Sequence, residues 1–112
     1  MSEENDNFRQ RVFQIVAAIP YGKIATYGDI AQLADSPRAS RQVGGVLKRL
    51  PKDSKLPWHR VINRKGEISL VGGDYVRQKS ALQAEGIIFN RQGKVDLAKY
   101  RWQYAPLRRV SR

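Results

Sequence analysis

The apolar residues in the first half of this chain follow a helical spacing, which predicts an amphipathic first helix. They recur three or four positions apart over residues 8–19, and so form one stripe along a helix. The stripe consists of Phe8, Val12, Ile15, Val16 and Ile19. Pro20 and Gly22 are expected to end this helix, and a short connector follows.

Two further helices are predicted close together. Thr26 and Asp29 have the spacing of a capping box, so a helix of about two turns is expected to start there. The run Asp-Ser-Pro at 35–37 offers a turn, an N-cap and a proline suited to the first helical position. A third helix is therefore expected from this run to about Leu50. Two short helices joined by a short turn are typical of the helix-turn-helix motif.

The third predicted helix has an apolar side and a basic side when its residues are placed at about 100° intervals. The apolar side consists of Ala39, Val43, Val46, Leu47 and Leu50. The opposite side consists of Arg38, Arg41, Gly45 and Lys48. Gly44 and Gly45 each cost roughly 0.5–1 kcal/mol relative to alanine inside a helix, which indicates close approach of another backbone. That backbone is either a neighbouring helix or a nucleic acid, and Arg41 is either a solvated arginine or a nucleic-acid contact.

The second half of the chain alternates short apolar runs with turn residues, which predicts two small β-hairpins. The first hairpin, a wing, is expected to pair residues 61–62 with 67–69 across a turn at 64–66. The second is expected to pair residues 87–89 with 94–95 across 90–93. The aromatic residues near the end are expected to hold the chain against the body: Tyr100, Trp102 and Tyr104.

A fourth helix is predicted between the two hairpins, after a flexible loop at 70–73. Asp74 is expected to cap it, Val76, Ala81 and Leu82 to be its apolar residues, and Gly86 to end it. The predicted fold is therefore mainly α with small β-hairpins, as in a winged helix-turn-helix domain. Residues 8–104 are expected to form this single domain, 1–7 a flexible N-terminus and 105–112 a basic, disordered tail.

The amino-acid composition excludes several kinds of chemistry for this protein. The 112 residues include no cysteine and one histidine, which excludes disulfides and thiol nucleophiles and leaves no ligand set for a structural metal site. Twenty-one Lys and Arg against 10 Asp and Glu give a net charge of +11, which favours a polyanionic partner. No apolar run approaches the ~20 residues that span a bilayer, and residues 1–8 do not resemble a signal peptide. A cytoplasmic protein without a membrane, metal or cofactor requirement is expected.

The run Pro57-Trp58-His59-Arg60 combines residue types that packing alone does not require. Pro57 restricts its own φ and the conformation of the residue before it, so Trp58 is presented from a defined bend. Val61 then begins an apolar run that is typical of a buried strand. Trp58 is therefore either a core anchor or the wall of a pocket.

Four motifs occur in order along residues 8–86: Ile-Pro-Tyr-Gly-Lys at 19–23, Thr-Tyr-Gly at 26–28, Ser-Arg-Gln-Val-Gly-Gly at 40–45 and Pro-Trp-His-Arg-Val at 57–61. Together they resemble the DNA-binding domain of the O6-alkylguanine-DNA alkyltransferases. In those enzymes a Pro-Cys-His-Arg run holds the cysteine that accepts the alkyl group, and here Trp58 stands in its place. This replacement, with Trp-Gln-Tyr at 102–104, resembles the alkyltransferase-like proteins.

The resemblance implies roles for individual residues. Tyr27 matches the tyrosine that crowds the 3′ phosphate and rotates the nucleotide outward, and Arg41 matches the finger that fills the vacated space. The helix of Arg41 is implied to enter the minor groove, and the DNA contacts implied on it are Arg41, Gln42, Gly45 and Lys48. The lesion pocket is implied to consist of Tyr27, Trp58, Val61, Leu70 and Val71.

Other family positions are implied to be structural here. His59 and Glu85 match the relay that activates the cysteine, and Arg60 matches a structural anchor. Two departures leave the tolerated adduct size open: Leu50 replaces a linker asparagine, and Leu70-Val71 replace a Tyr-Ser pair. Alkyl transfer needs a soft, ionisable nucleophile, normally a thiolate. The indole of Trp58 is only an N–H donor, so transfer to a thiol is excluded.

The function implied is therefore non-enzymatic. The protein is expected to bind O6-alkylguanine in double-stranded DNA by base flipping, without alkyl transfer, and to flag the lesion for nucleotide excision repair. A UvrA-type damage-recognition protein is the implied partner, and the chain is expected to act as a monomer near the nucleoid. One alternative is a winged helix-turn-helix transcription regulator that reads the major groove. A second is a hydrolase that uses His59 and Glu85, although no nucleophile is evident.

Overall fold

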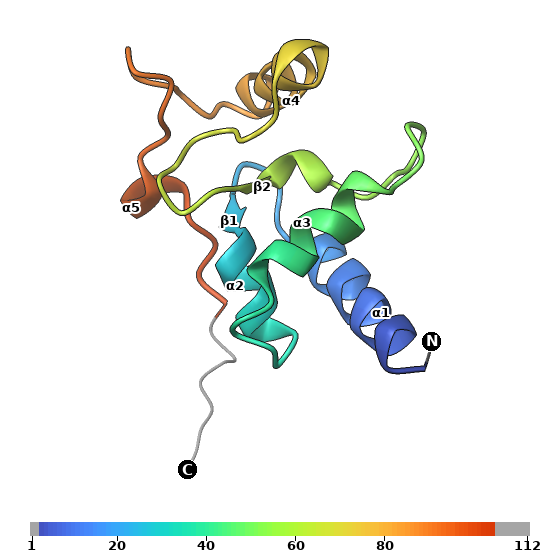
Figure 1. Cartoon of the computed structure of the whole chain (residues 1–112). Helices are drawn as coiled ribbons and strands as arrows, with labels where there is room; N and C mark the ends of the chain where they lie inside the picture. The colour runs from blue at the N-terminus through green and yellow to red at the C-terminus, as the bar shows by residue number, and fades with distance from the viewer. Residues whose placement is uncertain (1–2, 105–112) are drawn as a thin grey trace.

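A short parallel pairing at the centre of the molecule separates two packed halves. In the computed structural model, which describes residues 3–104, β1 (Ala25–Thr26) pairs in parallel with β2 (Val61–Ile62). Because successive side chains of a strand point to opposite faces, Val61 of β2 packs in one half and Ile62 in the other. Figure 1 shows α1, α2 and α3 on one side of this pairing and α4 on the other.

The first half is built from α1 (Glu3–Ala17), α2 (Tyr27–Leu33) and α3 (Ser40–Lys48). Its core takes one residue from each strand, together with the apolar stripes of the helices. The buried members are Val12, Val16, Ile19, Ala25, Ile30, Ala31, Val43, Val46 and Val61. The predicted apolar stripe of the first helix and most of the apolar side of the third therefore face one core. Leu50, which was predicted on that side, lies beyond the end of α3 and is not part of this core.

The second half is built from α4 (Gly72–Ala84), α5 (Leu97–Tyr100) and the loops between them. Its buried residues are Ile24, Ile62, Ile68, Leu82, Ile87, Val95 and Tyr100. Ile62 belongs to this core while its neighbour Val61 belongs to the other, so β2 joins the halves. The predicted apolar Val76 is 61% exposed, because it lies on the outer side of α4.

The first predicted helix starts earlier than expected. Helix α1 begins at Glu3 rather than Phe8, so part of the segment predicted to be flexible is helical. The capping box is confirmed: the Thr26 hydroxyl accepts a hydrogen bond from the Asp29 N–H at 3.0 Å, and the Thr26 N–H donates to Asp29 Oδ2 at 3.1 Å. The two short helices of the helix-turn-helix prediction are both present as α2 and α3, with residues 34–39 between them.

The predicted cap of the third helix is wrong. Helix α3 begins at Ser40, with Ala39 at its N-cap, and not at the Asp-Ser-Pro run. Asp35 has a left-handed φ of 66°, and the Ser36 N–H donates to the Ala31 carbonyl at 2.9 Å. This arrangement closes the end of α2 in a Schellman motif. The run therefore ends one helix instead of starting the next.

The cap of α4 is also different from the prediction. The helix begins at Gly72 with Val71 at the N-cap, so Asp74 lies within the first turn. Its predicted end is confirmed: Gly86 has a φ of 88°, and the Ile87 N–H donates to the Leu82 carbonyl at 3.1 Å. Leu82 and Ile87 also share the second core, as is common at helix ends of this kind.

The wing prediction is wrong in its pairing. The turn after β2 forms, since the Asn63 N–H donates to the Glu67 carbonyl at 3.1 Å, but Glu67 pairs with Lys94 and not with a strand at 61–62. Both residues of β2 are buried, and their backbone pairs with β1 instead. The second hairpin is confirmed as a single antiparallel bridge between Phe89 and Val95.

The segment that carries the last three described aromatic residues is attached to the body, as predicted. The Ile24 N–H donates to the Tyr100 carbonyl at 2.9 Å, and the Trp102 N–H donates to the Ile24 carbonyl at 2.7 Å. The Tyr104 hydroxyl donates to Asp29 at 3.4 Å. The tail predicted at 105–112 lies outside the described residues. Within residues 3–104, no helix has the length and apolar character needed to cross a membrane.

Candidate nucleic-acid interface

A hollow of about 570 Å³ lies between α3, the Trp58 turn and the loop before α4. Its volume falls within the roughly 300–1,000 Å³ typical of small-molecule sites. The lining residues are Tyr27, Ser40, Arg41, Gly44, Gly45, Leu47, Lys48, Trp58, Asn63, Ser69 and Leu70. The hollow therefore combines an aromatic wall, a basic helix face and several short polar side chains.

The helix side of the hollow is formed by one exposed face of α3. Arg41 and Lys48 are exposed, and Gly44 and Gly45 lie between them. A methyl group added at Gly44 would lie 3.8 Å from the Tyr27 ring, and one added at Gly45 would lie 3.6 Å from the Arg49 guanidinium. Both are ordinary contact distances, so packing inside the protein does not require these glycines. Their cost in a helix is better explained by an external molecule that approaches this face.

The opposite wall is formed by Trp58, which starts a 3-10 turn, η1 (Trp58–Arg60). Trp58 is half-buried, and its ring lies edge-to-face with the His59 ring at a centroid distance of 6.3 Å. Buried Gln78 on α4 fixes this turn, because its Nε2 donates to the carbonyls of His59 at 3.0 Å and Val61 at 2.9 Å. Trp58 is therefore held from behind by α4.

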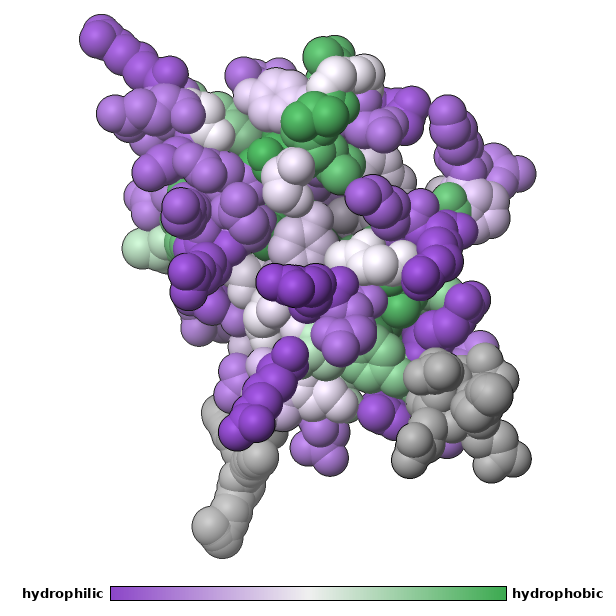
Figure 2. Space-filling view, viewed as in Figure 1, coloured by the Kyte–Doolittle hydropathy of each residue, from purple (hydrophilic) through white to green (hydrophobic). Residues whose placement is uncertain are grey.

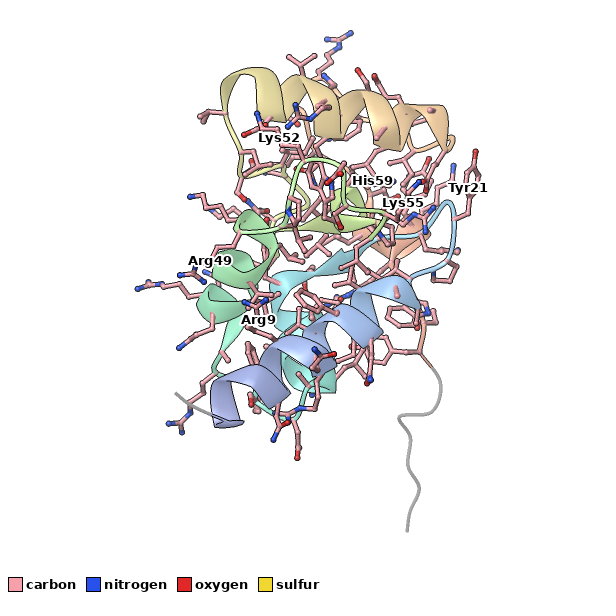
Figure 3. All side chains as sticks on the ribbon, turned by 90° about the vertical axis from the view of Figure 1, so that its right-hand side faces the viewer. Arg9, Tyr21, Arg49, Lys52, Lys55 and His59 are labelled. Carbon is pink, nitrogen blue, oxygen red and sulfur yellow. The ribbon has the colours of Figure 1, made fainter. Side chains whose placement is uncertain are left out.

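Glu85 connects the Trp58 turn to the end of α1. Its carboxylate accepts hydrogen bonds from Arg60 Nη2 at 2.8 Å, from His59 Nε2 at 2.7 Å and from the Gly22 N–H at 2.8 Å. Arg60 also donates to the Ile19 carbonyl at 2.8 Å. Because a carboxylate only accepts, His59 Nε2 carries the proton. Figure 3 shows His59 inside the molecule beneath α4 and Tyr21 at its edge.

These contacts determine the charge state of Glu85. Burial alone would raise the pKa of its carboxyl, but the hydrogen bonds from Arg60, Gly22 and His59 lower that pKa from 4.5 to about 2. A carboxylate held in this state is a poor general base at neutral pH. The group therefore acts as an anchor for the turn, as the family resemblance implies, and Glu85 does not itself supply the base that the hydrolase alternative requires.

A second buried carboxylate stabilises the helix that carries Tyr27, another lining residue of the hollow. Asp29, which caps α2, accepts hydrogen bonds from Arg101 at 2.6 and 3.0 Å. Burial would raise the pKa of Asp29, but the hydrogen bonds from Arg101 and Thr26 lower it below the usual value. Arg101 thus ties the segment after α5 to the start of the helix that carries Tyr27. The Tyr27 hydroxyl lies 3.3 Å from Ser69 Oγ across the hollow.

The structure brings together most, but not all, of the residues proposed from the sequence. Six of them line the hollow: Tyr27, Arg41, Gly45, Lys48, Trp58 and Leu70. Val61 does not, because it is 1% exposed and belongs to the first core. Val71 is 82% exposed outside the hollow, and Gln42 lines a separate depression with residues 36–39.

Five lining residues were missed in the sequence: Ser40, Gly44, Leu47, Asn63 and Ser69. Helical spacing could have found two of them, because Ser40 and Gly44 lie one turn apart on the stripe that ends at Lys48. Asn63 and Ser69 had no comparable signal, since loops bring them to the hollow. No group of metal-ligating side chains occurs in the part of the chain that the structure describes.

The surface around the hollow is predominantly polar. Figure 2 shows hydrophilic side chains over most of one face, with apolar atoms gathered at the end of the molecule where α4 lies. Two exposed apolar residues lie at the start of α4 or just before it, Val76 and Val71. Arg49 extends outward from the end of α3 in Figure 3, beside the basic face.

Comparison with known proteins agrees with this geometry. Residues 7–87 match the family model described as 6-O-methylguanine DNA methyltransferase, DNA binding domain. The chain is 64% identical over 102 residues to the DNA base-flipping protein of Escherichia coli (strain K12), covering 91% of this chain and 79% of that protein. It is 39% identical over 104 residues to Alkyltransferase-like protein 1 of Schizosaccharomyces pombe, covering 88% of this chain and 96% of the relative.

A solved structure extends the comparison to three dimensions. It is S. pombe Atl1 in complex with damaged DNA containing O6-carboxymethylguanine. The two folds superpose with a TM-score of 0.81 at 38% identity, over 93% of this chain and all of the other. The mainly helical fold with a two-strand sheet is therefore shared with a protein that binds damaged DNA.

Proposed function

Because this chain belongs to the family of the 6-O-methylguanine DNA methyltransferase DNA-binding domain, we propose that it binds O6-alkylguanine in double-stranded DNA and leaves the adduct in place. The observation that carries the proposal is the hollow in which Tyr27, Arg41 and Trp58 meet, in a chain without cysteine. Its near relatives are named as a DNA base-flipping protein and an alkyltransferase-like protein, which supports the same role.

Base flipping fits the dimensions and chemistry of this hollow. A flipped purine needs a concave site with a flat apolar wall and polar groups at its edges. Trp58 provides the wall, while Ser69 and Asn63 provide short polar side chains. In this proposal α3 enters the minor groove, Tyr27 displaces the phosphate and Arg41 occupies the space left in the duplex. Flipping costs a few kcal/mol, and stacking of Arg41 offsets part of it.

The absence of transfer follows from the side chains that face the base. A thiolate is the usual acceptor for an alkyl group on O6, and neither Trp58 nor any other residue supplies one. We therefore propose that the bound lesion persists and serves as a signal for nucleotide excision repair, with a UvrA-type protein as partner. In this proposal the chain acts as a monomer in the cytoplasm.

The first prediction tests the proposal directly. Duplexes that differ only in guanine or O6-methylguanine should bind with different affinities, and the lesion duplex should bind at least severalfold tighter. Mass measurement after incubation should find both the oligonucleotide and the protein unchanged. Equal affinities would instead favour the alternative of a transcription regulator, which binds undamaged duplex DNA according to its sequence. Methyl loss from the DNA would contradict the absence of transfer.

The affinity for DNA should fall steeply as the salt concentration rises. A net charge of +11 on 112 residues and the exposed lysine and arginine on α3 imply several phosphate contacts. The logarithm of the binding constant should fall linearly with the logarithm of salt, with a slope of about −0.9 per phosphate neutralised. For four phosphates, doubling the salt concentration lowers the affinity about tenfold. Titrations at several salt concentrations measure this slope, and a flat response would contradict DNA binding through the basic face.

A further inference from the structure

Asn63 lines the hollow and carries a side-chain amide whose orientation is fixed. It follows β2 directly, is half-buried and lines the hollow together with Trp58. Its side-chain oxygen accepts two backbone hydrogen bonds, from Lys65 N at 2.9 Å and from Glu67 N at 2.9 Å. Because only the oxygen end of an amide accepts, these two bonds determine which end is the NH₂ group.

The NH₂ group of Asn63 is available to a ligand. Among residues 3–104, Nδ2 has no hydrogen-bond partner, and it is not among the atoms that are buried without one. The side chain cannot rotate to use its oxygen instead without breaking two hydrogen bonds. An amide held in this way can donate to a bound molecule but cannot accept from it.

The turn that carries Asn63 is rigid. The Gly66 N–H donates to the Asn63 carbonyl at 3.0 Å, and the Val95 N–H donates to the Gly66 carbonyl at 2.9 Å. Gly66 has a φ of 79°, and a Cβ there would lie 2.6 Å from the Val95 carbonyl oxygen, so other residues are excluded. The donor is therefore positioned before any ligand arrives, and binding requires little further ordering of this side chain.

Alkylation at O6 changes the hydrogen-bonding edge of guanine in a way that such a donor can detect. Guanine carries a hydrogen on N1, which makes N1 a donor. An alkyl group on O6 fixes the base in the form in which N1 carries no hydrogen. N1 therefore becomes a hydrogen-bond acceptor. A fixed donor facing N1 therefore bonds the lesion and opposes the normal base. Sites built on a required hydrogen bond discriminate more strongly than apolar pockets do.

We propose that Asn63 is a specificity-determining residue that donates from Nδ2 to the unprotonated N1 of the flipped O6-alkylguanine. This inference rests on the proposed function, since it concerns the same hollow and the same ligand. The recognised feature is the unprotonated N1, which is common to all O6-alkylguanines. Recognition of N1 does not depend on the size of the adduct, whereas a pocket fitted to one alkyl group would.

The chain contains a second turn of the same construction, which serves as a matched control. Asn90 accepts backbone hydrogen bonds from Gln92 N at 2.9 Å and Lys94 N at 3.0 Å, and the Gly93 N–H donates to its carbonyl at 2.9 Å. Asn90 lines a different depression, away from Trp58. A substitution at Asn90 therefore has the same effect on a turn and on the net charge without changing the hollow.

The test compares Asn63→Asp with Asn90→Asp. Each aspartate keeps one oxygen for the two backbone N–H groups and replaces the NH₂ group with an acceptor. Both variants should melt at similar temperatures. For Asn63→Asp, the ratio of affinities for O6-methylguanine and guanine duplexes should fall roughly tenfold, since a donor is lost and an acceptor faces N1. For Asn90→Asp, the ratio should equal that of the wild type.

A modified base provides a second measurement on the unaltered protein. In 1-deaza-O6-methylguanine a C–H group replaces N1, so the acceptor is removed while the methyl group stays. The wild type should bind this duplex roughly tenfold more weakly than the O6-methylguanine duplex, and Asn63→Asp should show no such preference. An unchanged ratio in Asn63→Asp, or equal wild-type binding of both modified bases, would overturn the inference. A wild type that does not prefer O6-methylguanine over guanine would instead overturn the proposed function.

Discussion

Replacing Glu85 with alanine is expected to lower the free energy of unfolding by about 3 kcal/mol. The carboxylate is 7% exposed and pairs with Arg60 and His59, whose side chains are 15% and 19% exposed. Without it, the Arg60 guanidinium remains largely buried beside an unpaired histidine, and breaking such a pair typically costs about 3–5 kcal/mol. The pKa of Glu85, lowered from 4.5 to about 2, corresponds to a stabilisation of about 3 kcal/mol, which agrees with the loss expected for the alanine variant. Urea unfolding monitored by tryptophan fluorescence measures the change.

The same pair predicts a dependence of stability on pH. The pKa of Glu85 is lower in the folded state than its ordinary value, so its contribution is complete above about pH 5. The contribution is lost progressively as the pH falls from about 5 to about 2. Asp29, whose pKa is also lowered, acts in the same direction. Glu85→Ala should therefore lose less stability on acidification than the wild type.

Glu67 provides a matched control for Glu85. It is paired with Lys94 at 4.0 Å, and the two side chains are 37% and 43% exposed. Pairs of this kind contribute about 0–1 kcal/mol, so Glu67→Ala should change stability little. Similar losses in the two variants would mean that Glu85 does not act as an anchor and that the Trp58 turn is held by Gln78 alone.

Replacing Arg41 with alanine is expected to weaken lesion binding by about 2 kcal/mol, or roughly thirtyfold, without unfolding the protein. Arg41 is exposed on α3 and lines the hollow opposite Trp58, while Val43 on the other side of the helix is buried. Stacking against a base typically contributes about 1–3 kcal/mol, and the charge adds an attraction to phosphate. Fluorescence anisotropy with an O6-methylguanine duplex measures the loss, and a thermal melt confirms the fold.

Arg38 separates the role of Arg41 from a general effect of charge. It is also exposed and lies in the turn before α3, where it lines a separate depression. Arg38→Ala removes the same charge and should lower the affinity for lesion and normal duplexes by the same small factor. If Arg41→Ala behaves in the same way as Arg38→Ala, Arg41 does not occupy the space left by a flipped base.

The sequence carried strong local signals for the helices. The spacing of Val12 and Val16 predicted the buried side of α1, and Thr26 with Asp29 predicted the start of α2. These signals succeed because a helix repeats every 3.6 residues and its caps involve residues only a few positions apart. The prediction made from the Asp-Ser-Pro run was wrong for a related reason. Its residues suit either the end of one helix or the start of the next, and the left-handed Asp35 selected the first.

The pairing of the strands could not be read from local patterns. Val61 and Ile62 were correctly predicted to be buried, but a two-residue strand has no alternation that identifies its partner. The choice of β1 over residues 67–69 depends on both faces of β2 being covered, one by the helices of the first half and one by α4. That condition exists only after both halves have packed.

For the candidate site, the sequence alone determined the chemistry that is available. The absence of cysteine excludes thiol transfer wherever the residues lie, and the motifs containing Tyr27, Arg41 and Trp58 identify the family without any coordinates. Composition and ordered motifs are properties of the chain, so folding does not change them. The tertiary structure decided which side chains share the hollow. It excluded Val61 and Val71 and added Asn63, because contacts between residues distant in the chain depend on loop paths that no periodic pattern encodes.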